Sequence, residues 1–177
     1  MLPTSNPQLS KISRGDICED QIKVIAADLS FWIDGDGPVL SFPRLDLSSN
    51  RNLTHALYKS EMEAVLGAAH LECVNPGDHG YPVIVGNSRK TCKNYIDSLG
   101  TKRIICDRAL FDQLNSTERY VLVHHEYAGL AGIEQSNGDD SIYFISNQIP
   151  QYLNDASDKK LSIPAKGGVL NLVEIAA

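Results

Sequence analysis

The sequence contains no apolar run approaching the roughly 20 residues that a membrane-spanning helix needs, so we expect no membrane span. It also lacks an excess of positive charge, since its formal net charge is −6 and its pI is near 5.3. A surface that follows a phosphate backbone must be basic, and the composition therefore argues against a nucleic-acid partner. The first residues show no charged stretch followed by an apolar core. If the protein is exported, we expect its signal to be absent from this sequence.

Several enzyme signatures are missing as well. There is no Gly-x-Ser-x-Gly segment for a serine hydrolase and no glycine-rich phosphate loop. The His-x-Glu of zinc deaminases is present at His124, but the Pro-Cys-x-x-Cys that must follow it is not. These absences remove three common classes of enzyme.

The cysteines are even in number and form no Cys-x-x-Cys pair that would bind a metal. They are Cys18, Cys73, Cys92 and Cys106. Three of them lie beside loop or strand-end signals, where crosslinks often hold small exported proteins together. We therefore predict two disulfides and a secreted or periplasmic protein, with all three pairings open. Four reduced, buried thiols in the cytosol are the alternative.

The length favours a single domain, and the residue patterns along it predict an α+β fold. A chain of 177 residues is long enough for one substantial core. Residues 1–14 are polar and contain prolines, so we predict a flexible N-terminal arm, followed by a single globular domain over 15–177. Helical spacing of apolar residues predicts a helix from a cap at Asp16 to the breaker cluster 34–38, and a second over about 52–72. A capping box at Asn115 and Glu118 predicts a third helix, which ends at Gly132.

Short β-rich runs supply the sheet. We predict strands at 83–85, 91–96 and 102–106, with weaker candidates at 39–42, 141–146 and 169–173. A helical turn is expected over 107–114 and a short last helix over 147–153, broken by Pro150. The predicted fold is three main helices packed on a small mixed sheet and linked by disulfides.

The end of the third helix carries the strongest chemical pattern. His125 and Glu126 are adjacent, as a metal-bound imidazole and a proton-accepting carboxylate are in zinc hydrolases. A second helical ligand would stand one turn later, where this chain has Gly129. Gly132 then turns the chain and Glu134 follows.

Residues 102–153 thus resemble the core of a zincin of the metzincin type, with a strand, a His-Glu helix, a glycine turn and a downstream acid. They are also similar to small exported bacterial proteins with a His-Glu-Tyr segment, a Gly-Ile-Glu-like turn and a Tyr-x-Ile-Ser stretch, here Tyr143–Ser146. The resemblance implies zinc as a cofactor, His125 as its ligand, Glu126 as general base and Glu134 as a third ligand. The missing ligand would have to come from elsewhere, and the candidates are His124, His79, Asp139 and Asp140.

Two functions follow from this resemblance. In the first, the protein is an exported zincin-like factor without full peptidase activity that binds a peptide or protein ligand or has a structural role. In the second, it is a metal-dependent hydrolase of peptide or amide bonds. The two differ in whether a metal is held at His125.

Overall fold

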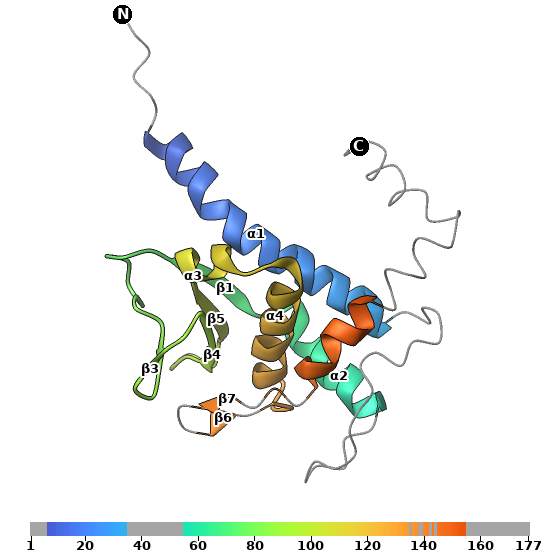
Figure 1. The fold of residues 1–177 in the computed structure, drawn as a ribbon. Coiled ribbons are helices and arrows are strands. Elements are labelled where there is room, and N and C mark those ends of the chain that lie inside the picture. Colours follow the sequence, from blue (N-terminus) through green and yellow to red (C-terminus); the bar gives the residue numbers. More distant parts are fainter. Residues whose placement is uncertain are drawn as a thin grey trace, which may run out of the picture.

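The computed structural model describes residues 7–34, 55–134, 136–137, 140–141, 143 and 145–154, with side chains from residue 17 onward except at 136, 137 and 140. Helices pack around a small mixed sheet, as the predicted α+β class requires. Figure 1 shows the long first helix, α1 (Pro7–Asp34), lying across the top of the molecule, with the sheet below it. The helix α4 (Ser116–Leu130) stands beside the sheet. No described helix combines the length and the apolar character that crossing a membrane requires.

The sheet has three strands in the order β1 (His70–Val74), β5 (Lys102–Asp107) and β4 (Cys92–Ile96). β5 runs parallel to β1 and antiparallel to β4. The apolar run Ile104, Ile105 and Cys106 is fully buried, as expected of a central strand covered on both faces. The predictions of β4 and β5 are confirmed to within one residue at each end.

Both predicted disulfides are present. Cys92 and Cys106 are directly opposite each other in the antiparallel pair of β4 and β5, and their sulfurs are bonded. Cys18 is bonded to Cys73, which is the register partner of Cys106 on the other side of β5. The two bridges therefore meet at one point of the sheet, and Cys18–Cys73 ties the first helix to it.

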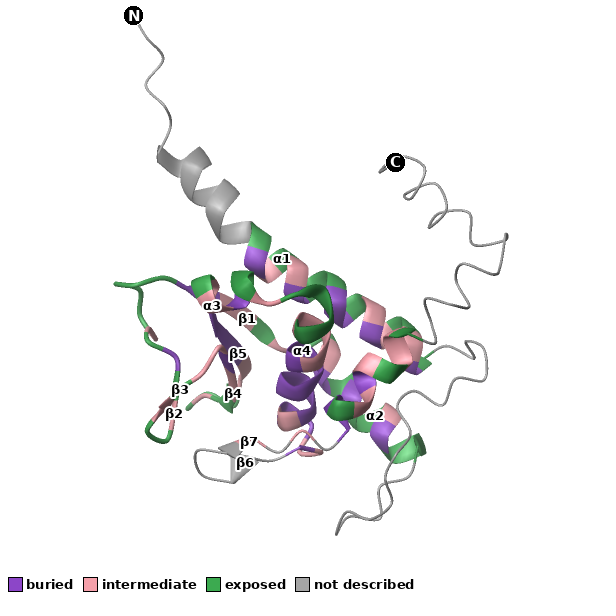
Figure 2. Ribbon diagram, in the orientation of Figure 1, coloured by how far each residue is buried: buried purple, intermediate pink, exposed green. Residues whose placement is uncertain are grey.

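That helix, α1, spans Pro7–Asp34 and is longer than predicted. It begins at Pro7, so Asp16 lies inside the helix instead of capping it, and residues 7–14 of the predicted arm are helical. Proline is well suited to a first helical position because its missing N–H has no partner there in any case. The buried face of α1 is Cys18, Ile22, Ile25, Ala26, Leu29 and Ile33 (Figure 2).

The second helix, α2, spans His55–Leu66 and ends earlier than predicted. Residues 70–72, which the apolar spacing placed in the helix, belong to strand β1. Gly67 follows the last helical residue, and the next segment pairs with β5. Strand pairing with a buried central strand thus overrides the local helical pattern.

The remaining described elements are short. β2 (Ile84–Val85) pairs with β3 (Ser88–Arg89), and α3 (Arg108–Gln113) follows β5 with Asp107 as its cap. β6 (Ser136–Asn137) pairs with β7 (Asp140–Ser141). The 3-10 turn η1 (Ser146–Gln148) leads into a helical segment over 149–154, so Pro150 lies near a helix start and does not break it. The predicted strands at 39–42 and 169–173 and the cluster 35–38 lie outside the described residues.

Candidate functional site

The His-Glu segment lies on α4 (Ser116–Leu130), which begins with the predicted capping box of Asn115 and Glu118. This helix contacts α1 and α2, the strands β4 and β5, and η1. Because neighbours surround its last two turns, Leu122 to Ala128 are all buried, polar residues included. His124, His125 and Glu126 are therefore all desolvated, although they point in different directions around the helix.

The carboxylate of Glu134 is the centre of a buried hydrogen-bond network. It accepts from the backbone N–H of Ile145 at 2.6 Å and of Ser146 at 2.7 Å. Its second oxygen accepts from the Ser146 hydroxyl at 2.9 Å and contacts Nδ1 of His125 at 2.5 Å. His125 and Glu134, which the resemblance implied as ligands of one metal, are therefore in direct contact.

Gly132 makes this convergence possible. Its φ of +70° is a left-handed conformation that glycine adopts without strain. The next two backbone N–H groups, those of Ile133 and Glu134, both return to the carbonyl of Ala128. This is the hydrogen-bond pattern of a glycine-terminated helix, and it turns Glu134 back toward the preceding turn of α4.

The charge on Glu134 fixes the tautomer of His125. Burial by itself would raise the pKa of Glu134, but the hydrogen bonds from His125 and Ser146 and the nearby histidines outweigh it and lower that pKa. The carboxylate is then ionised at neutral pH and can only accept hydrogen bonds. His125 must therefore carry a proton on Nδ1, which it donates to Glu134.

His124 belongs to the same network but faces the core. Its Nδ1 lies 2.6 Å from the Ser146 hydroxyl, and its Nε2 lies 2.8 Å from the Tyr58 hydroxyl. Since Ser146 donates to Glu134, it must accept from His124, and Tyr58 then donates to the other ring nitrogen. Burial lowers the pKa of His124 to about 4, which keeps the ring neutral. Tyr58, His124 and Ser146 thus form a series of hydrogen bonds in which each donor points toward Glu134.

Glu126 points toward the sheet instead. One carboxylate oxygen accepts from the side-chain amide of Asn94 on β4 at 2.7 Å. Burial raises the pKa of Glu126, because the bond from Asn94 only partly compensates for the lost hydration of the carboxylate. Glu126 forms no salt bridge with any described residue.

Gly129 leaves the space that Asn94 fills. A Cβ built on Gly129 would lie 2.4 Å from the amide nitrogen of Asn94 and 2.8 Å from its Cγ. The Asn94 side chain thus occupies the volume of any side chain at position 129. This is the position, one turn after His125, at which a second helical ligand would stand.

Glu126 lines a polar pocket, and His125 contacts Tyr143, another of its lining residues. The His125 ring stacks on Tyr143, with ring centroids 4.0 Å apart. Tyr143 and Glu126 both line a pocket of about 390 Å³. Its other lining residues are Arg89, Lys90, Thr91, Cys92, Leu122 and Ser141. Burial, together with the nearby charges of Glu126 and Glu134, raises the pKa of Tyr143 to about 12.

The described residues contain no group of three or more His, Cys, Asp or Glu side chains placed to hold a metal ion. Of the predicted metal ligands, His125 and Glu134 lie next to each other, and they form a hydrogen bond with each other. His124 has both ring nitrogens engaged in the core. His79 is exposed in the loop after β1. The side chains of Asp139 and Asp140 lie outside the described residues.

Three participants were not predicted from the sequence as site residues: Asn94, Tyr58 and Ser146. Asn94 comes from a different strand and Tyr58 from a different helix, so no local spacing links either to α4. Ser146 closes the Tyr143–Ser146 stretch that entered the resemblance, which is the one signal that pointed to it.

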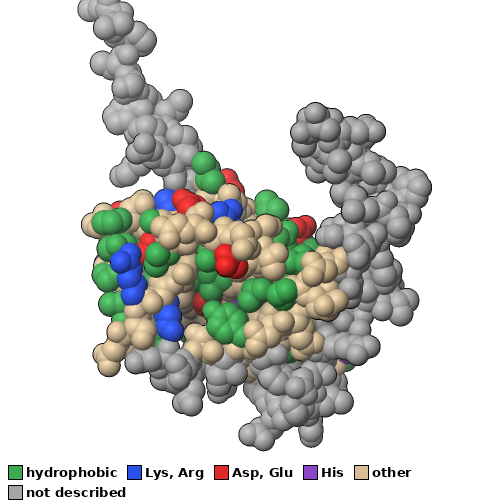
Figure 3. Space-filling model, viewed as in Figure 1, with side chains coloured by type: hydrophobic (Ala, Val, Ile, Leu, Met, Phe, Trp, Pro, Cys, Tyr) green, Lys and Arg blue, Asp and Glu red, His purple; other side chains and the backbone are tan. Residues whose placement is uncertain are grey.

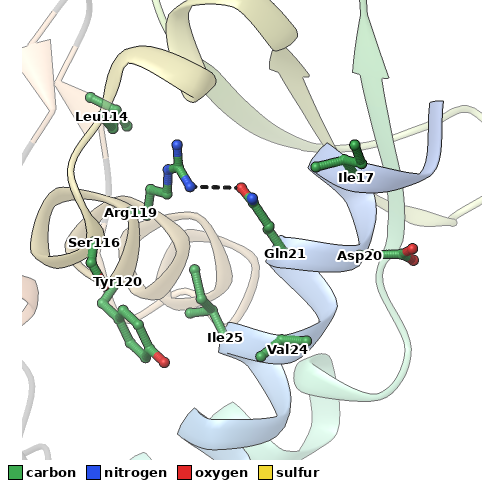
Figure 4. Close-up of a pocket in the computed structure, with 9 residues that line it drawn as sticks. All are labelled: Ile17, Asp20, Gln21, Val24, Ile25, Leu114, Ser116, Arg119 and Tyr120. Carbon is green, nitrogen blue, oxygen red and sulfur yellow. Dashed lines mark hydrogen bonds between the residues drawn. The ribbon is translucent and has the colours of Figure 1, made fainter. Parts of the chain in front are cut away.

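A second pocket of about 500 Å³ lies away from this site, between α1 and the start of α4. Figure 4 shows Ile25 of α1 on the side of Tyr120, and Arg119 hydrogen-bonded to Gln21 across the pocket. Over the face of the molecule in Figure 3, acidic and basic side chains are interspersed with apolar ones.

Comparisons of the chain with protein-family models, with curated proteins and with solved structures gave no match.

Proposed function

We propose that this is an exported zincin-like protein in which the His-Glu helix serves as a binding or structural scaffold instead of a peptidase centre. The observation that carries the proposal is the Asn94 side chain, which fills the position of the second helical ligand and hydrogen-bonds to Glu126. In a working His-Glu peptidase that carboxylate would face a metal-bound water.

The partners of the remaining candidate ligands support the same proposal. Glu134 accepts hydrogen bonds from two backbone amides, from Ser146 and from His125, so binding a metal would break contacts that hold residues 145 and 146 in place. The network therefore has a structural use, which is to attach the segment after α4 to the helix end.

One observation favours the hydrolase as a second candidate. Metal-bound histidines commonly donate their other nitrogen to a carboxylate, which is what His125 does with Glu134. However, only two atoms of these residues are left to coordinate a metal, namely Nε2 of His125 and one oxygen of Glu126. Zinc sites with catalytic activity use three protein ligands, so the described residues do not fit a zinc centre.

Export is part of the proposal because of the two disulfides, which persist in oxidising compartments. Both bridges involve buried cysteines of the core, so we expect the fold to depend on them.

The test is metal analysis of the purified, oxidised protein after incubation with zinc and dialysis, for the wild type and for His125→Ala. His55→Ala is the matched control, because His55 is an exposed histidine on α2. We expect no stoichiometric zinc in any of the three proteins and no cleavage of a casein substrate. One zinc per chain that is lost only in His125→Ala would overturn the proposal in favour of the hydrolase.

A further inference from the structure

The pocket beside α4 is enclosed by three parts of the chain. Leu122 and Glu126 come from α4, and Arg89 to Cys92 come from β3 and the start of β4. Ser141 of β7 and Tyr143, two residues later, complete the lining. A carboxyl group therefore lines one wall, and a basic pair, Arg89 and Lys90, lies on another.

Glu126 has unused binding capacity in this pocket. Its side chain is buried, with only 3% of the residue exposed. Oε2 accepts a hydrogen bond from Asn94, and no described residue forms a hydrogen bond with Oε1. A buried carboxylate without a cation is costly. A ligand ammonium group would provide the missing charge and the missing hydrogen-bond donor.

Arg89 offers the opposite chemistry. One of its terminal nitrogens donates to Asp107 at 2.6 Å and to the Tyr81 hydroxyl at 2.9 Å. These two bonds hold the guanidinium in place, and its side chain is 52% exposed. A guanidinium has five N–H donors in a fixed fork, so the remaining donors suit a carboxylate.

We propose that this pocket binds a small ligand that carries both an ammonium group and a carboxylate, namely a free amino acid or the end of a short peptide. The ammonium group binds Glu126, the carboxylate binds the Arg89 side of the pocket, and an apolar side chain lies against Leu122 and Tyr143. The volume of about 390 Å³ accommodates a ligand of this size. This inference rests on the proposed binding function and names its ligand class.

The test is isothermal titration calorimetry of the intact, oxidised protein with L-leucine as probe, alongside N-acetyl-leucine and leucine amide. The acetyl derivative lacks the ammonium group and the amide lacks the carboxylate. We expect leucine to bind and each derivative to bind about tenfold more weakly. Glu126→Gln should weaken leucine binding by a similar factor, while Glu61→Gln, an exposed glutamate on α2, should leave it unchanged.

Two results would overturn the inference: no heat of binding for any of the three compounds at millimolar concentration, or equal affinity for all three. Because the three ligands are compared on the wild type, the test does not depend on whether a variant folds. Zinc content measured on the same samples separates this outcome from failure of the proposed function. A zinc-loaded protein would refute the scaffold, whereas a zinc-free protein that ignores leucine would refute only the ligand class.

Discussion

The side-chain amide of Asn94 lies where a side chain on Gly129 would have to be, 2.4 Å from the ideal Cβ position. The two residues come from β4 and α4, and together they decide what Glu126 contacts. With a glycine at position 129, the strand side chain reaches the helix and hydrogen-bonds to the carboxylate. Asn94 therefore fills the space beside Gly129 in which the side chain of a second metal ligand would lie.

The first prediction concerns this pair. Gly129→Ala should destabilise the protein by about 1–2 kcal/mol, because the steric cost of overpacking exceeds the roughly 1 kcal/mol that alanine gains over glycine in a helix. Combining it with Asn94→Ala should cost less than the two single changes together, since the clash is then gone. Urea unfolding measures all three.

Gly67→Ala is the control, because a Cβ at that glycine meets nothing within 4 Å. Additive effects in the double variant would show that residues 94 and 129 are not in contact.

The second prediction concerns Glu134. Glu134→Gln should lower the free energy of unfolding by about 2–4 kcal/mol, because an amide cannot accept from all four donors and leaves buried groups unpaired. Hydrogen exchange of the Ile145 and Ser146 amides should also accelerate, since both donate to this carboxylate. Glu61→Gln should change neither measurement. Unchanged exchange at 145 and 146 would contradict the proposed anchoring of this segment.

The third prediction concerns pH and Glu126. Its pKa is raised in the folded protein, mainly by burial. Its contribution to stability is therefore fully present below the unfolded pKa of about 4.3 and is lost as pH rises through the folded pKa. Glu126→Gln does not titrate and keeps an acceptor for Asn94. The stability of this variant relative to wild type should increase between about pH 4 and pH 7.5 in urea unfolding. A difference that is constant over this range would refute the pKa shift.

The fourth prediction concerns the disulfides. In the chain-entropy model, removing Cys18–Cys73, which are 55 residues apart, should cost about 4 kcal/mol. Removing Cys92–Cys106, 14 residues apart, should cost about 3 kcal/mol. Paired Cys→Ala variants measured by thermal unfolding test the order. Intact mass with and without reductant must show the loss of both bridges on reduction, and an unchanged mass would contradict both.

The sequence was a good guide at several places where a structure depends on near neighbours along the chain. The capping box at Asn115, the glycine turn at Gly132 and the strand Lys102–Asp107 are set by local hydrogen bonding, backbone freedom and apolar runs. An even number of cysteines without the Cys-x-x-Cys spacing of metal ligands was likewise enough to predict disulfides, though not their pairing. Where neighbours in space compete with local pattern, the sequence misled: residues 70–72 have helical spacing but pair with β5.

What only the tertiary structure decided is the chemistry around His125. The sequence placed His125, Glu126, Gly129 and Glu134 on one short segment, and the resemblance to zincins implied that His125 and Glu134 would converge after the turn at Gly132. It could not place Asn94 against Gly129, or Ser146 between Glu134 and His124, because those residues are brought in by other elements. A hydrogen bond depends on distance in space, and for side chains far apart in sequence that distance is fixed by how helices and strands pack.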